Sequence, residues 1–419
     1  MQIAVFTICA RNYLPRAETL RDSLQQHNPG LPFFIFLADA AGPADRLPAG
    51  TVPVAGLDIP GWQEMAFRYT LLEFSTSIKA DCFIHLLRRQ GFDAAIFLDP
   101  DIEVFGPLDA VRDALAEGQA AVLTPHLLDP HKAHLSGRDL EIVRSGAFNL
   151  GFAAFSRHEQ SLAFLDWWAA KLRTDCYAAS EAGLFVDQRF CDMAPAFIEQ
   201  LRILRHPGYN VAYWNLSERT ITRDDNQILV NGEPLVFFHF SGLGIGDSGQ
   251  LSRHLGPDQP DMSPCLTGLV QSYAEAVTVH QEASGMHTRP YAYNRFANGM
   301  ALLQPMRRDP PAHGSPQDWF LAPDIAYWNS RDPHISGGGP KITRLMGAYL
   351  RLRPDLMRRF PMTSLEGRRD YLAWFCRHGA CEYDIPDCFL PGGRLGALGV
   401  TGAGLILRAM RSLVRRAGS

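Results

Sequence analysis

The stretch Ala94-Ala95-Ile96-Phe97-Leu98-Asp99-Pro100-Asp101-Ile102 is the most informative segment of the chain. Its apolar run predicts a strand that is buried inside a sheet. Two aspartates follow at positions i and i+2, and at strand spacing they point to the same side. Carboxylates at this spacing suit a hard divalent cation. The alternative is a solvated turn at the strand end, since Asp and Pro are both common in turns.

Strand and helix patterns alternate on both sides of this segment. Apolar runs at 3–9, 33–37 and 120–123 predict further buried strands, and 15–27, 62–72 and 77–89 predict helices. This alternation is typical of a parallel, doubly wound α/β sheet. Ligands of such sheets bind beyond the carboxyl ends of the strands. We therefore expect a binding site at the edge where Asp99 and Asp101 lie.

The composition indicates an ordinary globular protein of two or three domains. The chain has 419 residues, of which 46% are apolar and 20% charged. After about residue 260, helical patterns alternate with loops rich in Pro and Gly. We expect an α/β domain over residues 1–260, a smaller and mainly helical region over 261–390, and a basic tail over 391–419.

Charge and cysteine content restrict the partners and the compartment. Lys and Arg number 40 and Asp and Glu 44, giving a net charge of −4, which argues against a dedicated nucleic-acid binder. The eight cysteines show no disulfide-framework spacing, which favours a reducing compartment. The N-terminus lacks a basic segment followed by a long apolar one, so we expect no signal peptide and a cytoplasmic protein.

The tail after residue 391 is basic and amphipathic. It carries Arg394, Arg408, Arg411, Arg415 and Arg416, and from residue 405 onward apolar residues are interleaved with the arginines. A short helix of this kind can lie on an anionic membrane. The tail is therefore a candidate peripheral contact with the inner face of a membrane, and packing on its own domain or on a partner is the alternative.

Three other apolar runs also carry isolated polar residues. His239 lies within the apolar run 236–240, before the glycine-rich run 242–246, where an imidazole could complete a metal site and backbone N–H groups could approach phosphate. Asn149 opens the strand pattern 148–155. Asp187 and Gln188 lie in an otherwise apolar stretch. The plain alternatives are a core histidine, a turn and a helix cap, respectively.

Taken in order, these motifs resemble those of a known family. The series Asp-x-Asp, Phe-Asn-x-Gly, Asp-Gln and His-x-x-Gly is similar to that of nucleotide-sugar glycosyltransferases of the GT-A fold, most like the family-8, retaining type found in bacterial surface polysaccharide clusters. The resemblance covers about residues 1–245. It implies a mixed, Rossmann-like sheet in a catalytic domain over 1–260. It also implies transfer of a hexosyl group from a nucleotide-diphosphate sugar, a UDP-sugar, to a glycan or lipid-linked saccharide, with retention.

The resemblance also implies a metal and diphosphate site. Asp99, Asp101 and His239 would ligate Mn²⁺ or Mg²⁺, and the ion would bridge the donor diphosphate. Gly242 would lie at the phosphates. The family usually has a Lys shortly after its His-x-x-Gly, whereas this chain has none there, and Arg253 is the nearest cation.

The remaining implied roles concern the nucleotide and the sugar. The residues expected near the nucleotide and its ribose are Thr7, Tyr13 and Lys79. Asn149 and Asp187 would contact the sugar or the acceptor, and Gln188 would lie near the anomeric carbon. Asp187 and Gln188 are thus the candidate catalytic residues.

The chemistry is consistent without the family name, and two other functions stay open. A cation held by two carboxylates would stabilise the negative charge that grows on a departing nucleoside diphosphate. A sugar nucleotidyltransferase also uses a metal on an α/β sheet, but normally has a basic, Gly-rich loop where this chain has residues 10–13. A non-catalytic glycan-binding or scaffold subunit with the same fold is the other possibility.

Overall fold

The computed structural model describes residues 1–43, 45–133, 139–225, 227–246, 250–255, 262–311 and 313–391. From residue 392 on, the expected basic tail lies outside the described residues. The chain divides into two compact units, Met1–Tyr293 and Asn294 to the C-terminal end. The N-terminal unit contains the motifs discussed above.

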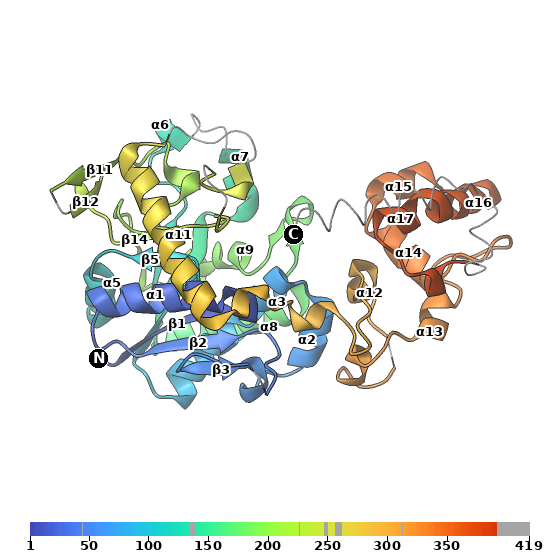
Figure 1. Cartoon of the computed structure of the whole chain (residues 1–419), viewed down its shortest axis with the longest axis horizontal. Helices are drawn as coiled ribbons and strands as arrows, with labels where there is room; N and C mark the ends of the chain where they lie inside the picture. The colour runs from blue at the N-terminus through green and yellow to red at the C-terminus, as the bar shows by residue number, and fades with distance from the viewer. Residues whose placement is uncertain are drawn as a thin grey trace. The chain divides into compact units, whose positions relative to one another are not determined.

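A seven-stranded mixed sheet forms the centre of the N-terminal unit (Figure 1). Its strand order is β10-β6-β7-β4-β1-β2-β3. The strands are β1 (Ile3–Cys9), β2 (Phe33–Leu37), β3 (Thr51–Pro53), β4 (Ala94–Leu98), β6 (Ala121–Pro125), β7 (Phe148–Ser156) and β10 (Leu201–Ile203). The α/β fold class with a mixed sheet is confirmed.

One strand runs against the others. β7 is antiparallel to both of its neighbours, β4 and β6, while the other neighbouring pairs of this sheet are parallel. The all-parallel sheet predicted from alternation is therefore wrong for β7. The cause is the connection from β6, which returns at the same edge: Pro125 pairs with Phe148, and the His126 N–H donates to the Ala147 carbonyl at 2.9 Å.

Helices cover both faces of the sheet, as a doubly wound fold requires. On one face, Val5 and Ile96 pack with residues of α1 (Leu14–His27) and α5 (Asp109–Ala116). On the other, Phe6 and Phe155 both contact Phe83 of α4 (Lys79–Ile84), and Phe155 also contacts α8 (Glu159–Asp175). Successive strand residues point to opposite faces, so the continuous apolar runs fill both layers.

The helix expected over 62–72 is divided in two. α2 (Trp62–Arg68) ends before Thr70, which caps the next helix, α3 (Leu71–Ser77). The Glu73 carboxylate accepts from the Thr70 N–H at 2.9 Å, and the Glu73 N–H reaches the Thr70 hydroxyl at 3.5 Å. This capping box satisfies N–H groups at the start of α3 and fixes the break.

A long helix from beyond residue 260 belongs to the N-terminal unit. α11 (Pro264–Ser284) packs against α1, and its Tyr273 ring stacks on Phe240 with centroids 4.0 Å apart. The domain boundary expected at residue 260 assigned this helix to the C-terminal region, whereas the first compact unit extends to Tyr293. The apolar face of α11 explains the difference, since it covers the strand that carries His239.

Shorter elements complete the N-terminal unit. The helices are α6 (Pro130–Ala133), α7 (Asp139–Ser145), α9 (Gln188–Cys191) and α10 (Ala194–Phe197). The strands outside the main sheet are β5 (Ile102–Val104), β8 (Ala178–Ala179), β9 (Leu184–Phe185), β11 (Ile221–Asp224), β12 (Gln227–Val230), β13 (Glu233–Pro234) and β14 (Phe237–His239).

The C-terminal unit is mainly helical, as predicted. Its helices are α12 (Gln304–Arg308), α13 (Ile325–Asn329), α14 (Arg344–Arg351), α15 (Pro354–Arg359), α16 (Leu365–Trp374) and α17 (Ala380–Glu382). Its buried aromatic side chains include Trp328, Tyr349, Tyr371 and Phe375. Within the part of the chain that the structure describes, no helix has both the length and the apolar character needed to cross a bilayer.

Phe6 offers a test of how the sheet is packed. Its ring lies 4.7 Å from Phe83, 5.2 Å from Phe97 and 5.5 Å from Phe36, centroid to centroid, and is fully buried. We expect Phe6→Ala to lower the free energy of unfolding by about 3–5 kcal/mol, because it leaves a cavity. Urea denaturation measures the loss. The control Leu72→Ala, at a side chain 53% exposed, should change it by no more than about 0.5 kcal/mol. Equal effects of the two would contradict this packing.

Candidate functional site

The turn between β4 and β5, together with the pairing of β5 with β14, brings three candidate metal ligands to one edge of the sheet. Asp99 and Asp101 lie in the turn between β4 and β5. β14 pairs antiparallel with β5, so that His239 lies opposite Ile102. The next residue, Phe240, donates its N–H to the Asp101 carbonyl at 2.8 Å. Backbone pairing therefore places the imidazole beside the two carboxylates.

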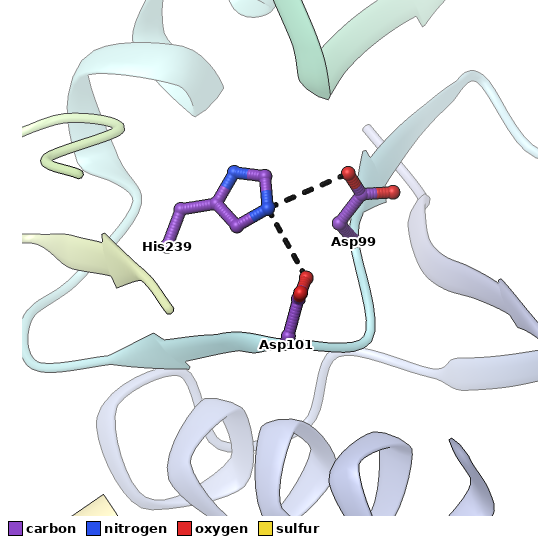
Figure 2. Close-up of side chains that lie close together, drawn as sticks. All are labelled: Asp99, Asp101 and His239. Carbon is purple, nitrogen blue, oxygen red and sulfur yellow. Dashed lines mark ion pairs between the residues drawn. The ribbon is translucent and has the colours of Figure 1, made fainter. Parts of the chain in front are cut away.

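Figure 2 shows the His239 imidazole facing both aspartates through one nitrogen. His239 Nε2 lies 3.1 Å from Asp101 Oδ1 and 3.6 Å from Asp99 Oδ2. One ligand atom from each residue lies within 4.8 Å of the other two. Among the described residues, this is the one group of three or more His, Cys, Asp and Glu side chains arranged to hold a metal ion.

The charges of this cluster favour a cation. Burial raises the pKa of Asp99 to about 6, although Lys79 and His239 act in the opposite direction. Burial would also raise the pKa of Asp101, but His239 and then Arg16 outweigh it and hold that pKa below its ordinary value. Burial acts against a charged His239, yet the two aspartates raise its pKa. Two carboxylates thus face a single imidazole, and a dication would compensate the excess negative charge.

The antiparallel direction of β7 places its first residues beside the cluster. The Asp99 N–H donates to the Gly151 carbonyl at 2.8 Å. A Cβ on residue 151 would lie 2.4 Å from His239 Cε1 and 2.8 Å from Asn149 Oδ1. Gly151 is therefore required where the His239 ring packs against the backbone of β7. Trp214 packs edge-on against the same ring, with centroids 5.2 Å apart.

The Asn149 carboxamide is occupied by protein groups. Its Oδ1 accepts from Gly151 N–H at 3.0 Å and from Asn210 Nδ2 at 3.1 Å. Its Nδ2 lies 3.2 Å from His126 Nε2. Burial lowers the pKa of His126 to about 4, so the imidazole is neutral and its Nε2 can accept from Asn149. Asn149 thus orders the backbone beside His239, and sequence reasoning missed the supporting roles of His126 and Asn210.

Asp187 and Lys79 form a buried ion pair. Lys79 Nζ lies 2.5 Å from Asp187 Oδ2 and donates to the Leu150 carbonyl at 2.7 Å. Both side chains are 3% exposed or less. Val186, the residue before Asp187, has a φ of +42°, which strains a β-branched residue and marks a position fixed by its surroundings. The Lys79 ammonium therefore lies with Asp187 at the start of β7.

Gln188 links β7 to α7. Its Oε1 accepts from the Leu150 N–H at 3.0 Å, and its Nε2 donates to the Ser145 carbonyl at 2.9 Å. Leu150 therefore contacts both halves of the Asp-Gln motif, because its N–H meets Gln188 and its carbonyl meets Lys79, the partner of Asp187. The motif and the Phe-Asn-x-Gly segment form one connected unit.

The remaining predicted residues lie around the turn after β1 and the turn after β14. Thr7 is fully buried inside β1, and its hydroxyl has no hydrogen-bond partner among the residues that the structure describes. Tyr13 ends a short 3₁₀ turn, and the Arg16 guanidinium lies 5.0 Å from its ring centroid. Burial raises the Tyr13 pKa, and Asp101 adds to this. Tyr13, in the turn after β1, therefore lies within electrostatic range of the cluster.

The turn after β14 is held from two sides. Arg16 donates to the Leu243 carbonyl at 2.6 Å. Gly242 has a φ of +76°, and a Cβ there would lie 2.6 Å from Ser252 Oγ and from His254 Cδ2. The Arg253 N–H donates to the Gly242 carbonyl at 3.0 Å, and the Arg253 side chain is exposed. Sequence reasoning missed Arg16, which only the fold brings to this turn.

No protein-family model matches the chain. Two curated proteins of Bacillus subtilis (strain 168) are similar to part of it. YfnF, described as uncharacterized, is 27% identical over 154 residues, which are 36% of this chain and 49% of YfnF. YfnD, described likewise, is 26% identical over 184 residues, which are 42% of this chain and 55% of YfnD. The matched region spans about half the length of these two relatives.

Solved structures with partial similarity include two glycosyltransferases. The bifunctional glycosyltransferase WbbM has a TM-score of 0.39 and 14% identity, covering 68% of this chain and 51% of WbbM. The galactosyltransferase LgtC, in complex with donor and acceptor sugar analogues, has a TM-score of 0.39 and 12% identity, covering 66% of this chain and 95% of LgtC.

Gly151 tests the packing of His239. We expect Gly151→Ala to lower the affinity for Mn²⁺ by about 10- to 100-fold, because the new methyl group displaces the His239 ring. Isothermal titration with MnCl₂ measures the change. The control is Gly268→Ala in α11, where an added Cβ meets nothing within 4 Å. A folded Gly151→Ala protein that binds Mn²⁺ as tightly as the wild type would contradict the packing described.

Proposed function

We propose that this chain is a metal-dependent glycosyltransferase of the GT-A type. It would move a sugar from a nucleotide-diphosphate donor, a UDP-sugar, to a glycan or a lipid-linked saccharide. The observation that carries the proposal is the cluster of Asp99, Asp101 and His239 at the carboxyl edge of the sheet, beside the buried pair of Lys79 and Asp187. The cluster suits a metal-bound diphosphate, and the Lys79–Asp187 pair suits a reacting sugar.

The donor set of the cluster fits Mn²⁺ or Mg²⁺. Carboxylate oxygens suit both ions, and an imidazole nitrogen favours the softer Mn²⁺. Asp99, Asp101 and His239 would hold the ion, with His239 anchored by β14 and by Gly151. When bound, the cation would stabilise the negative charge on the departing diphosphate.

Residues beside the cluster would bind the diphosphate. Arg253 is exposed, and its backbone is fixed to Gly242. Its charge opposes the rise of the Tyr13 pKa, so its guanidinium lies within electrostatic range of that phenol. We assign to Arg253 the phosphate contact that a Lys would make in the family. Gly242 leaves room for the backbone to approach an anion.

Asp187 would act at the sugar end. Burial raises the pKa of Asp187, and the Lys79 ammonium opposes this. Paired with Lys79, the carboxylate would be a fixed negative charge for the positive charge that develops at the anomeric carbon. Gln188 would hold the start of β7 in register with Asp187 and border the anomeric carbon. No acid and base pair of the glycoside-hydrolase kind is needed, and we propose that the configuration is retained.

The cellular location and the partners that we propose are based on sequence features outside the site. We propose a cytoplasmic enzyme whose arginine-rich tail contacts an anionic membrane where a lipid-linked acceptor would reside. The balanced charge of the chain suits a small-molecule donor and a saccharide acceptor better than a nucleic acid.

Removal of the metal ligands tests the activity. We expect Asp101→Ala and His239→Ala each to lower Mn²⁺-dependent turnover of a nucleotide sugar by about 10²-fold or more, because each removes part of the charge stabilisation at the leaving group. Release of the nucleoside diphosphate, with Mn²⁺ or with EDTA, is the measurement. Asp166→Ala, at an exposed acid on α8, is the control.

Four results would overturn this assignment. Turnover that EDTA leaves unchanged, or that survives both substitutions, would remove the metal. Pyrophosphate release from a nucleoside triphosphate and a sugar phosphate would instead identify a nucleotidyltransferase. Glycan binding without turnover of any nucleotide sugar would identify a non-catalytic subunit.

Asp187 tests the division of the site into two ends. We expect Asp187→Asn to lower kcat by about 10²-fold or more, while the Kd of the nucleoside diphosphate changes little, because the carboxylate would act only on the sugar. Steady-state kinetics and calorimetry give the two quantities. Loss of nucleotide affinity with unchanged turnover at saturation would place Asp187 elsewhere. The anomer of the product, observed by NMR, decides retention independently.

A further inference from the structure

A short segment after α11 contacts the carboxyl ends of β1 and β2. α11 crosses α1 (Figure 1) and ends at Ser284, where Gly285 adopts a φ of +63° and turns the chain. The N–H of Gly285 donates to the Gln281 carbonyl at 2.8 Å. Residues 286–293, which we call the strap, then pass over the turn that follows β1.

The strap is anchored in the core at its first residue. Met286 is 4% exposed and packs with Cys9, Leu14 and Leu37, side chains of β1, α1 and β2. This contact fixes the start of the strap directly beside the strand ends. The anchor is apolar and independent of the charged contacts at the other end.

The far end of the strap is held by a buried carboxylate. Asp39, just beyond β2, is 1% exposed. Its Oδ1 accepts from the Ala292 N–H of the strap at 3.0 Å and from the Ala40 N–H at 2.8 Å. Its Oδ2 accepts from the N–H of Arg11 at 3.2 Å and from Arg11 Nε at 3.0 Å. Asp39 thus joins the strap to the turn after β1.

Arg11 completes these contacts. We call Arg11, Asp39 and Asp45, with their contacts to the strap, the latch. Its NH2 group donates to the strap carbonyl of Pro290 at 3.0 Å, and its NH1 group donates to Asp45 Oδ2 at 2.9 Å. Arg289 of the strap pairs with the same Asp45 at 3.5 Å. All three guanidinium nitrogens of Arg11 therefore have protein partners. Arg11 holds the strap and is not available to bind phosphate.

The order of the strands separates the strap from the sugar end of the proposed site, with β4 and β1 between them. The Lys79–Asp187 pair lies beside β7, the metal cluster follows β4, Tyr13 follows β1 and Asp39 follows β2. Neighbouring strands are about 4.8 Å apart, so β2 lies roughly 10 Å from β4 along the edge. A donor with its diphosphate at β4 and its sugar toward β7 would extend its nucleoside over β1 as far as the strap.

Aromatic rings lie at the C-terminal end of the strap. Tyr293 of the strap has its ring centroid 5.6 Å from that of Tyr291, 5.9 Å from Phe74 and 6.1 Å from Trp62. Tyr293 and Trp62 are both partly exposed. Aromatic side chains of this kind provide faces on which a nucleobase can stack.

We propose that the strap closes the nucleoside end of the donor site and that Arg11 is the positioning residue that fixes it there. The inference rests on the proposed function. It separates two parts of donor binding: the metal and the diphosphate bind at the cluster, while the base and ribose depend on the strap. A defect in the latch therefore weakens the binding of a nucleoside diphosphate and leaves that of pyrophosphate unchanged.

The test compares these two probes. Wild type, Arg11→Lys and Ala292→Pro are titrated in the presence of Mn²⁺ with pyrophosphate and with whichever of UDP, GDP, ADP and CDP the wild type binds most tightly. Lys retains the charge but cannot reach Asp39, Asp45 and Pro290 together, and Pro removes the N–H that donates to Asp39. We expect about a 10-fold loss of affinity for the nucleotide and less than a 2-fold change for pyrophosphate, as for the loss of one or two hydrogen bonds.

Two further variants make the outcome decisive. Tyr293→Leu leaves every charge of the latch in place and should give the same selective loss, so the test stands even if a latch variant fails to fold. Arg88→Lys, at an exposed bidentate pair with Asp166, should change neither affinity. Folded variants that bind the nucleotide like the wild type, or that lose both probes equally, overturn the role of the strap alone. A wild type that binds neither probe overturns the proposed function and the strap with it.

Discussion

The site depends on one electrostatic constraint, the concentration of several carboxylates at one edge of a sheet. Asp99, Asp101 and Asp187 lie near one another at that edge, where the Asp187 side chain is 3% exposed, that of Asp101 14% and that of Asp99 32%. Buried like charges are unfavourable unless cations compensate them. Lys79 compensates Asp187, and His239 partly compensates the other two. The remaining negative charge is the physical basis for a divalent cation at the cluster.

Backbone geometry brings these charges together. β7 runs antiparallel to β4, so its start meets the end of β4 and supplies Gly151, Leu150 and Asn149 to the site. The ribbon of β5 and β14 delivers His239 from a distant part of the sequence. α11 and Arg16 then hold the turn after β14. Backbone pairing places these groups, while in the proposed function the cluster, the Lys79–Asp187 pair and the strap would bind different parts of one extended donor.

Sequence patterns predicted the parts of this arrangement that depend on local chemistry. The apolar run before Asp99 indicated a buried strand because its residues face both layers of the sheet, and its aspartates marked the edge. The direction of β7 could not be predicted from alternation, since it depends on where the connection from β6 returns. The attachment of α11 and the partners of Asn149 and Arg11 depend on contacts between distant residues. Asn149 is an example. Its place in a motif suggested a contact with a ligand, and the structure shows its carboxamide oxygen accepting hydrogen bonds from Gly151 and Asn210.

We propose that Asp99, Asp101 and His239 bind a divalent cation together. The most direct measurement is anomalous diffraction at the manganese edge from crystals grown with MnCl₂ and a nucleoside diphosphate. We expect one strong peak within about 2.0–2.6 Å of His239 Nε2 and of an oxygen from each aspartate, the range for hard divalent cations in proteins. A manganese peak bound by other residues, with this cluster free of metal in the same crystals, would contradict it.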